Sequence, residues 1–598
     1  MSEPLDEPAW RAGMRWCTQL SLSSRVGRYP GLRPGSELLA RGRRFAKGAC
    51  ALGVDLCLDR DVGVTLRDGV KIYVDVFRPA DASGALPAIV AWSPYGKANG
   101  GNQHLDEFPF RAGVARSELS GLQMWEAPDP AWWCERGYAV VNVDARGAYS
   151  SEGRMAIWGT QEGRDGYDVV EWIAVQPWSN GRVGFAGNSW LAIVQWFIAA
   201  EQPPHLAAIA PWEGLCDGFR HNFQGGIVDP SFGETVLERS VGINEREDFT
   251  AMAREQPWLS AYWQDKVAQV ERIEVPAYVV ASWTNPVHTP GTFDAWQRLG
   301  SVAKWLRVHN TMEWPDFYAD RSRADLQRFF DRYLKGVDNG WESTPKVRIA
   351  VLGQEGRDEV DRPLPDFPPP APLHREFQLD TVDHALRLDA STEAGEARCE
   401  GPRDCLCFDL PIDRDSELIG FASLRLWVQL HEGSDQDLHV ALERLDSRGR
   451  RIAARSIPLP NRLVDKALRV VHRSGRVRAL DLLFPTRAKG QLRLSHREVD
   501  APLSRRERPI LAHHRETPVN PGDILPVDIA IDPVAWRLSA GQTLRLRIAG
   551  HDLAPKALPG VVPLPPRGQG RFSVWCGGAY ASHLWLPLAY ASSGSVPA

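Results

Sequence analysis

Short apolar runs without polar alternation recur through the first half of the chain, and they constrain its fold more than any other feature. Strands that are buried on both faces of a sheet appear as continuous apolar runs, whereas half-exposed strands alternate. The intervals between several of the runs are long enough to hold helices, which predicts a parallel sheet covered on both faces. The runs occupy residues 88–92, 139–143, 182–187, 277–282 and 304–308.

Three further segments complete this α/β part. Residues 62–66 and 70–77 predict two strands joined by an Asp68-Gly69 turn. The stretch 214–271 is rich in aromatic and charged residues and interrupts the series of strands, so we expect a helical cap there. Residues 325–336 carry apolar side chains at helical spacing and end on Gly336, which predicts a helix.

The second half of the chain has a different pattern. Leu424, Leu426, Val428 and Leu430 alternate with polar residues, and similar alternation recurs at 438–442 and 544–548, which predicts a β-sandwich. We therefore expect six segments. They are a helical extension at 1–57, with a basic amphipathic helix over 37–47, core segments at 58–213 and 272–337, the cap at 214–271, a proline-rich linker at 338–375 and the sandwich at 376–598.

Ser189 lies in Gly187-Asn-Ser189, between the apolar run 182–187 and an apolar segment at 191–200. Gly-x-Ser at a strand-to-helix turn is the nucleophile elbow of α/β-hydrolases, which lifts the serine hydroxyl above the sheet. The usual second glycine is absent, because residue 191 is Leu. The helix that follows offers the Trp190 backbone N–H to a developing oxyanion. The surroundings of Ser189 therefore predict a nucleophile.

Other candidate residues follow other apolar runs. Tyr95 comes after the run 88–92, where a second oxyanion donor is expected, although it would also suit a packing role. A serine nucleophile needs an acid and a base, which follow it in the order acid, then His. His309 ends the run 304–308 and is the first candidate for the base, with His288 as the alternative and a structural role open for both.

Taken together, these segments resemble the CocE/NonD hydrolases, the cocaine-esterase-like relatives of the Xaa-Pro dipeptidyl-peptidases. The resemblance implies an α/β-hydrolase core with a C-terminal jelly-roll sandwich. It also implies Ser189 as the nucleophile, Tyr95 and the Trp190 amide as the oxyanion hole, and an acid and a base near residues 285 and 309. The matching stretches are 66–79, 93–97, 142–147, 151–153, 165–172, 176–184, the Ser189 elbow, 521–529 and 538–548.

The acid position departs from the family pattern, because Trp283-Thr-Asn285 has Asn where the family has Asp. Asn orients an imidazole but cannot stabilise its positive charge, and the same replacement in trypsin lowers kcat about 10⁴-fold. Three outcomes are open. Turnover is slow, or the acyl-enzyme meets a nucleophile other than water, or a nearby carboxylate takes over, the candidates being Glu313, Asp316 and Asp294.

We therefore predict a serine esterase or amidase that acts on a small-molecule substrate through a Ser189 acyl-enzyme. Three alternatives stay open. The first is an acyltransferase on the same scaffold, with an amine or alcohol as acceptor. The second is a catalytically impaired binding scaffold, which Asn285 favours. The third is a peptidase of the Xaa-Pro type, for which fold analogy alone is a weak argument.

The composition limits the classes of partner that we expect for this chain. A formal charge of -5 on 598 residues is nearly neutral, so we expect neither nucleic acid nor membrane as a partner. The nine cysteines are dispersed and offer no zinc quartet, and we expect no metal or cofactor. The acidic first residues and the lack of a long apolar run favour a cytoplasmic protein, and a homodimer stays open.

Overall fold

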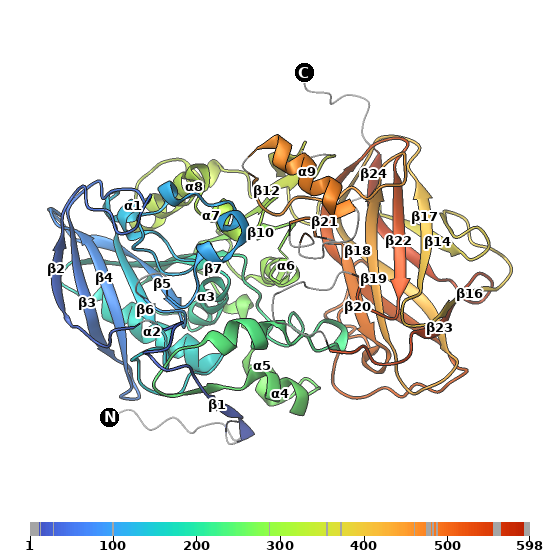
Figure 1. Ribbon diagram of the computed structural model, residues 1–598, viewed down its shortest axis with the longest axis horizontal. Coiled ribbons are helices and arrows are strands. Elements are labelled where there is room, and N and C mark those ends of the chain that lie inside the picture. Colours follow the sequence, from blue (N-terminus) through green and yellow to red (C-terminus); the bar gives the residue numbers. More distant parts are fainter. Residues whose placement is uncertain are drawn as a thin grey trace.

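The computed structural model shows two parts side by side, an α/β part and a β-sandwich (Figure 1). This architecture confirms the predicted fold class. The outer ends of the predicted extension and of the predicted sandwich, residues 1–10 and 591–598, lie outside the described residues. The structure describes residues 11–590 except 12, 28, 98–100, 286, 355–356, 371–373, 460, 474–479, 481–482, 486–487 and 554–563.

The α/β part is built on an eleven-stranded sheet with a parallel middle. Strands from β6 to β12 in the spatial order pair in parallel, and antiparallel pairs flank them at both edges. Each apolar run found in the sequence forms one of these strands. In spatial order they are β13 (Glu359–Leu364), β12 (Val347–Val351), β11 (Lys304–His309), β10 (Ala277–Ser282), β8 (Leu206–Trp212), β7 (Ser179–Asn188), β5 (Leu86–Ser93), β6 (Ala139–Asp144), β4 (Lys71–Pro79), β3 (Leu56–Thr65) and β2 (Gly35–Leu39).

Helices cover this sheet. Every residue of α3 is buried, which explains why the helix is apolar on all sides. The helix predicted near 325–336 is α8, and Gly336 follows its end with a φ of 73°. The helices of this part are α1 (Pro130–Cys134), α2 (Thr160–Ala174), α3 (Trp190–Ala200), α6 (Thr289–Arg298), α7 (Glu313–Phe317) and α8 (Asp320–Leu334).

Between β8 and β10 the chain leaves the sheet. This segment contains α4 (Phe249–Glu255), α5 (Ala261–Asp265), several single turns and the short strand β9 (Glu245–Glu247), which pairs with β1 (Trp16–Thr18). It lies within the range predicted as a helical cap.

The second part is a sandwich in which all described strand pairs but β15 with β17 are antiparallel, and β18 and β21 form the longest pair. Between β19 and β20 the chain leaves the sheet to form α9 (Arg462–Arg473). The strands of the sandwich are β14 (His374–Asp380), β15 (Ala385–Arg387), β16 (Gly395–Glu400), β17 (Cys405–Pro411), β18 (Ser416–Leu430), β19 (Asp437–Leu445), β20 (Lys489–Arg493), β21 (Ile524–Leu538), β22 (Thr543–Ala549), β23 (Arg571–Cys576) and β24 (His583–Tyr590).

Two predictions about local structure are wrong. Residues 35–39 form strand β2 instead of starting the predicted amphipathic helix, and their alternation leaves Leu38 exposed while it buries Leu39. The predicted linker at 338–375 contains β12 and β13, which belong to the α/β sheet. Pro363 fits there because β13 is an edge strand, where a missing N–H donor is tolerated.

A buried ion pair joins the two parts. Asp294 of α6 accepts a hydrogen bond from Arg508 of the sandwich at 2.5 Å and another from Arg298 at 3.0 Å. These positive charges hold the pKa of Asp294 below its usual range, although burial acts in the opposite direction. The carboxylate therefore holds the sandwich against the first helix after β10.

We predict that Asp294→Ala lowers the free energy of unfolding by about 1–3 kcal/mol, because it leaves the partly buried Arg508 without its carboxylate. Because the folded-state pKa of Asp294 is lowered, the contribution of the wild-type pair is present above about pH 4 and is lost as the pH falls through that pKa. Denaturant titrations at several pH values measure this. Glu342→Ala, which removes an exposed ion pair with Arg332, is the control and changes stability by less than about 1 kcal/mol. Equal losses in both variants would contradict the prediction.

Candidate active site

Ser189 lies at the turn between β7 and α3, with a left-handed φ of 56°. Such strain is typical of a nucleophile elbow, and the turn leaves the serine half-buried. A Cβ at Gly187 would lie 2.6 Å from the Cβ of Leu191, and one at Gly214 would lie 2.8 Å from the Cβ of Ala192. Glycines at both positions therefore allow the tight turn despite the Leu in place of the usual second glycine.

Tyr95 follows β5 and reaches the elbow from the neighbouring strand. Its side chain lies beside Ser189, and its ring packs edge-on against that of Trp190 at 6.1 Å between centroids. Burial raises the pKa of Tyr95 well above its usual value, so its hydroxyl remains a proton donor. The backbone N–H of Trp190 begins α3, where the first amides lack partners within the helix. Both groups thus lie next to Ser189, and their role as oxyanion donors stays a prediction.

His309 ends β11 and is buried next to a carboxylate that the sequence analysis missed. Its Nε2 lies 2.7 Å from Oε1 of Glu213, the residue directly after β8. Burial raises the pKa of Glu213 well above its usual range and lowers the pKa of His309 to about 4. Burial thus disfavours the charged form of each partner.

Asn285 connects this pair to a second carboxylate. Its Nδ2 donates to Glu213 Oε2 at 2.8 Å and to Glu313 Oε2 at 2.9 Å. Its Oδ1 accepts the backbone N–H groups of Val287 and His288. Asn285 thus lies near the predicted base, but as a donor to two glutamates and not as the partner of His309.

Glu126 lies next to Ser189, and the sequence analysis missed it. Its carboxylate lies beside the serine and accepts the indole N–H of Trp314 at 3.0 Å. Its backbone has a strained φ of 63°, and its carbonyl oxygen accepts the N–H of Asn188. Burial first, and the negative charge of Glu313 second, raise the pKa of Glu126 well above its usual range.

The structure therefore joins two groups of residues. Ser189, Tyr95 and Glu126 form the first, and His309, Glu213, Asn285 and Glu313 form the second. The backbone connects them, because the Ser189 N–H donates to the Glu213 carbonyl at 3.2 Å. The His309 ring contacts Glu213, Thr311 and Asp316.

The remaining candidates have other partners. Asp316 forms an ion pair with Arg307 and lies 3.8 Å from His309 Nε2, farther than Glu213. Asp294 forms ion pairs with Arg508 and Arg298. His288 immediately precedes α6, and its backbone N–H donates to Asn285. The carboxylate closest to His309 is thus none of the three that we predicted.

A cavity of about 170 Å³ opens beside Glu126. Aromatic rings of Trp125 and Trp314 line it, and Phe108 packs on both of these rings. Glu126 is the residue that this cavity shares with the surroundings of Ser189. No group of three metal-ligating side chains occurs among the described residues, and none of their helices has the length and apolar character needed to cross a bilayer.

Two family models match the chain. The model of the X-Pro dipeptidyl-peptidase (S15 family) matches residues 68–253, and that of the X-Pro dipeptidyl-peptidase C-terminal non-catalytic domain matches residues 339–584. Cocaine esterase of Rhodococcus sp. (strain MB1 Bresler) is 28% identical over 370 residues, which cover 51% of this chain and 60% of that protein.

Two relatives are matched over most of their length. A provisionally named serine esterase of Mycobacterium tuberculosis (strain CDC 1551 / Oshkosh) is 24% identical over 623 residues, covering 84% of this chain and 91% of that protein. The crystal structure of a CocE/NonD family hydrolase from Staphylococcus aureus superposes with a TM-score of 0.83 at 29% identity, covering 95% of this chain and 98% of that one. This chain therefore belongs to the CocE/NonD family of serine hydrolases.

Proposed function

We propose that the protein hydrolyses a small-molecule carboxylic ester or amide through an acyl-enzyme on Ser189. The observation that carries the proposal is the strained elbow, which places the Ser189 hydroxyl beside one carboxylate and one protonated phenol. In the first step the Ser189 oxygen bonds to the substrate carbonyl carbon and gives up its proton. The Tyr95 hydroxyl and the Trp190 amide stabilise the oxyanion, and the alcohol or amine then leaves with a proton.

Glu126 is our candidate for the base in this step. A general base has to be within hydrogen-bond reach of the proton that it removes, and its pKa should lie near the working pH. Glu126 lies beside Ser189, and burial raises its pKa well above the usual value. His309 is the second candidate, supported by Glu213 as its acid, and it requires a movement that brings the ring to the serine.

The surroundings of Ser189 also restrict the substrate. Glu126, Glu213 and Glu313 lie close enough that the charge of Glu313 shifts the pKa values of the other two. A carboxylate on the substrate would meet this repulsion in a poorly solvated site. We therefore propose esters or amides whose groups nearest to the reacting carbonyl are neutral or positively charged.

Labelling tests the nucleophile. We predict that a fluorophosphonate probe labels the wild-type protein on Ser189, and that Ser189→Ala abolishes both the labelling and the hydrolysis of a p-nitrophenyl ester. Ser179→Ala, which lies at the start of the same strand, is the control and keeps both. Release of the acyl group as the free acid, without an added amine or alcohol, supports hydrolysis over acyl transfer. A folded wild-type protein that stays unlabelled would contradict the proposal.

The identity of the base has its own test. We predict that Glu126→Gln lowers kcat/KM by about 10²–10⁴-fold, because the amide cannot accept the proton. The base acts when deprotonated, so wild-type activity falls as the pH drops through the raised pKa of Glu126, well above the usual value near 4.3. Glu126→Gln should remove this acid limb from the pH profile. A larger loss in His309→Asn, with the limb retained in Glu126→Gln, would assign the base to His309.

A substitution at Asn285 tests whether the site requires the amide or has simply lost its acid. We predict that Asn285→Asp gives no gain in activity and lowers the free energy of unfolding by about 1–3 kcal/mol, because it replaces two donated hydrogen bonds by repulsion from Glu213 and Glu313. Asn222→Asp is the control, since Asn222 donates to a backbone carbonyl. Denaturation and ester turnover measure both effects. Faster turnover in Asn285→Asp would show that the carboxylate is simply missing.

A further inference from the structure

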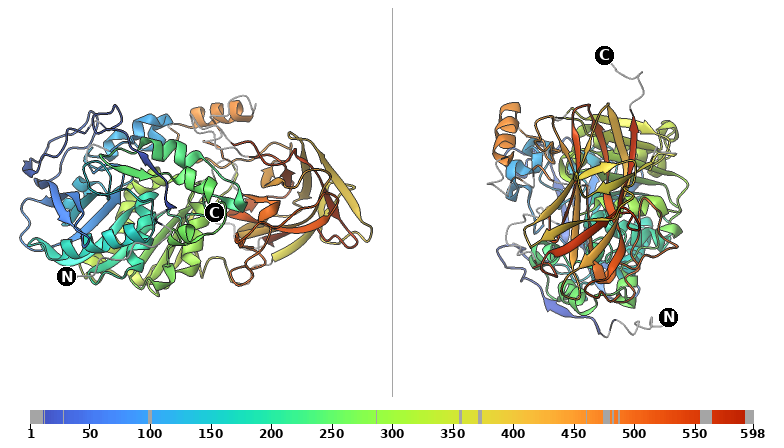
Figure 2. Two further views of the ribbon diagram at one scale, coloured as in Figure 1. Left: turned by 90° about the horizontal axis from the view of Figure 1, so that it is seen from below. Right: turned by 90° about the vertical axis from the view of Figure 1, so that its right-hand side faces the viewer.

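Helix α9 lies at the periphery of the molecule in every view, on a segment that leaves the sandwich between β19 and β20 (Figure 1 and Figure 2). Its sequence is strongly amphipathic. Leu463, Ala467 and Val470 are spaced i, i+4 and i+7 and therefore share one face. In a protein of this kind, such an apolar face normally packs on the core.

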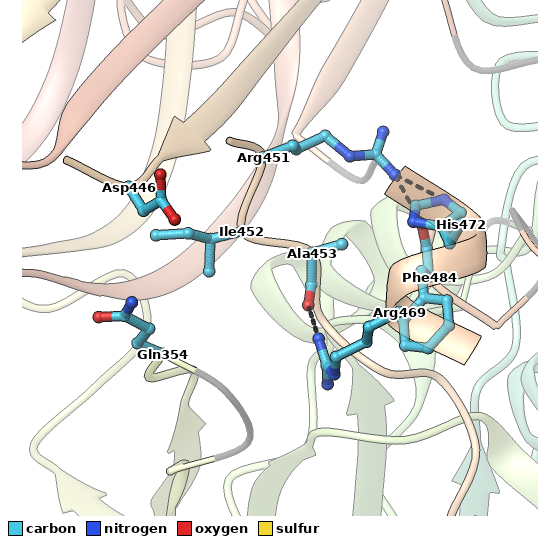
Figure 3. Close-up of a pocket in the computed structure, with 8 residues that line it drawn as sticks. All are labelled: Gln354, Asp446, Arg451, Ile452, Ala453, Arg469, His472 and Phe484. Carbon is cyan, nitrogen blue, oxygen red and sulfur yellow. Dashed lines mark hydrogen bonds between the residues drawn. The ribbon is translucent and has the colours of Figure 1, made fainter. Parts of the chain in front are cut away.

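The opposite face of α9 makes the contacts with the protein. His472 Nε2 accepts a hydrogen bond from Arg451 at 3.1 Å, and its ring packs against Phe484. Arg469 donates to the carbonyl oxygen of Ala453 at 3.0 Å (Figure 3). These polar anchors fix the rotation of the helix.

This rotation turns the apolar face outward. The side chain of Leu463 is 80% exposed, and that of Val470 is 59% exposed. Lys466 and Ala467 on the same side are exposed as well. Exposed large apolar side chains that stand alone are ordinary, but several on one helix face indicate a surface that binds something.

The charge of the segment indicates what it binds. Residues 446–473 contain eight Arg or Lys and two Asp, whereas the whole chain has a formal charge of -5. The two carboxylates are paired, Asp446 with Arg450 and Asp465 with Arg469. Lys466 stands directly beside the exposed apolar residues, and Arg462 and Arg473 are the first and last residues of the helix.

We propose that α9 docks the protein on an anionic lipid surface. An interfacial helix inserts its apolar side chains at the boundary of headgroups and acyl chains, while flanking cations bind the negative headgroups. The exposed face of α9 has both features. The occupant is a bilayer surface and not a span, and the proposal differs from the expectation drawn from the nearly neutral charge of the whole chain.

The segment that carries α9 also contacts the α/β part. The Met312 N–H donates to the Ser456 carbonyl oxygen at 2.5 Å, and the Met312 side chain packs with Ile457 and Phe484. The segment that carries α9 is thus attached to the α/β part as well as to the sandwich.

Vesicle binding tests the proposal with the full chain. We predict that the protein sediments with vesicles containing phosphatidylglycerol, that binding is weaker in high salt, and that vesicles of phosphatidylcholine alone bind at least tenfold less. Leu463→Ser with Val470→Ser should lower binding to the anionic vesicles about tenfold or more. Lys466→Glu should also weaken it.

The matched control is Val302→Ser with Val382→Ser, since these residues are 93% and 85% exposed but lie on other surfaces. This variant should bind vesicles like the wild type, and hydrolysis of a soluble ester checks that each variant is folded. No sedimentation with anionic vesicles would overturn the proposal, as would equal losses in both double variants. Binding to heparin or DNA without vesicle binding would overturn it, and so would a dimer that the Leu463 and Val470 changes dissociate.

Discussion

The parallel pairing of β7, β8, β10 and β11 is the constraint on which the active site depends. Parallel strands have their carboxyl ends at the same edge of the sheet, so the residues that follow them meet there. Asn188 pairs with Trp212, and Ser282 pairs with His309. The residues immediately beyond these pairs include Ser189 and Glu213. The register of these strands thus brings together site residues that are spread over more than a hundred positions of the sequence.

The sequence alone identifies most of this edge, because buried parallel strands leave apolar runs. It predicts β7, β10 and β11, and with them Ser189, Asn285 and His309 as neighbours. Strand β8 is harder to recognise, because its run contains Pro211 and follows closely on the apolar helix α3. Without β8 there is no reason to look at Glu213. The missed carboxylate is thus a consequence of one missed strand.

Other features have no local signal at all. Glu126 lies in an irregular loop, far from Ser189 in sequence, and only the folded structure brings its carboxylate to the serine. The two wrong assignments at the sheet edges have a related cause. Strand β2 exists because it pairs with β3, and β13 because it pairs with β12. Whether an edge segment forms a strand depends on its pairing with a separate segment. The periodicity within the segment shows only the secondary structure that the segment itself prefers.

The electrostatics of the site explain why an amide fits position 285 better than a carboxylate. Burial and mutual repulsion raise the pKa values of Glu126 and Glu213, so this region already resists negative charge. A fourth carboxylate, at position 285, would have to be protonated or to displace one of the other three. An asparagine instead donates to Glu213 and Glu313 at once and holds them at a fixed separation. We propose that Glu213, which follows β8 and contacts His309, takes the place of the family's aspartate after β10, whose charge would be unfavourable here. On this proposal, the departure from the family motif is coupled to a carboxylate one strand away.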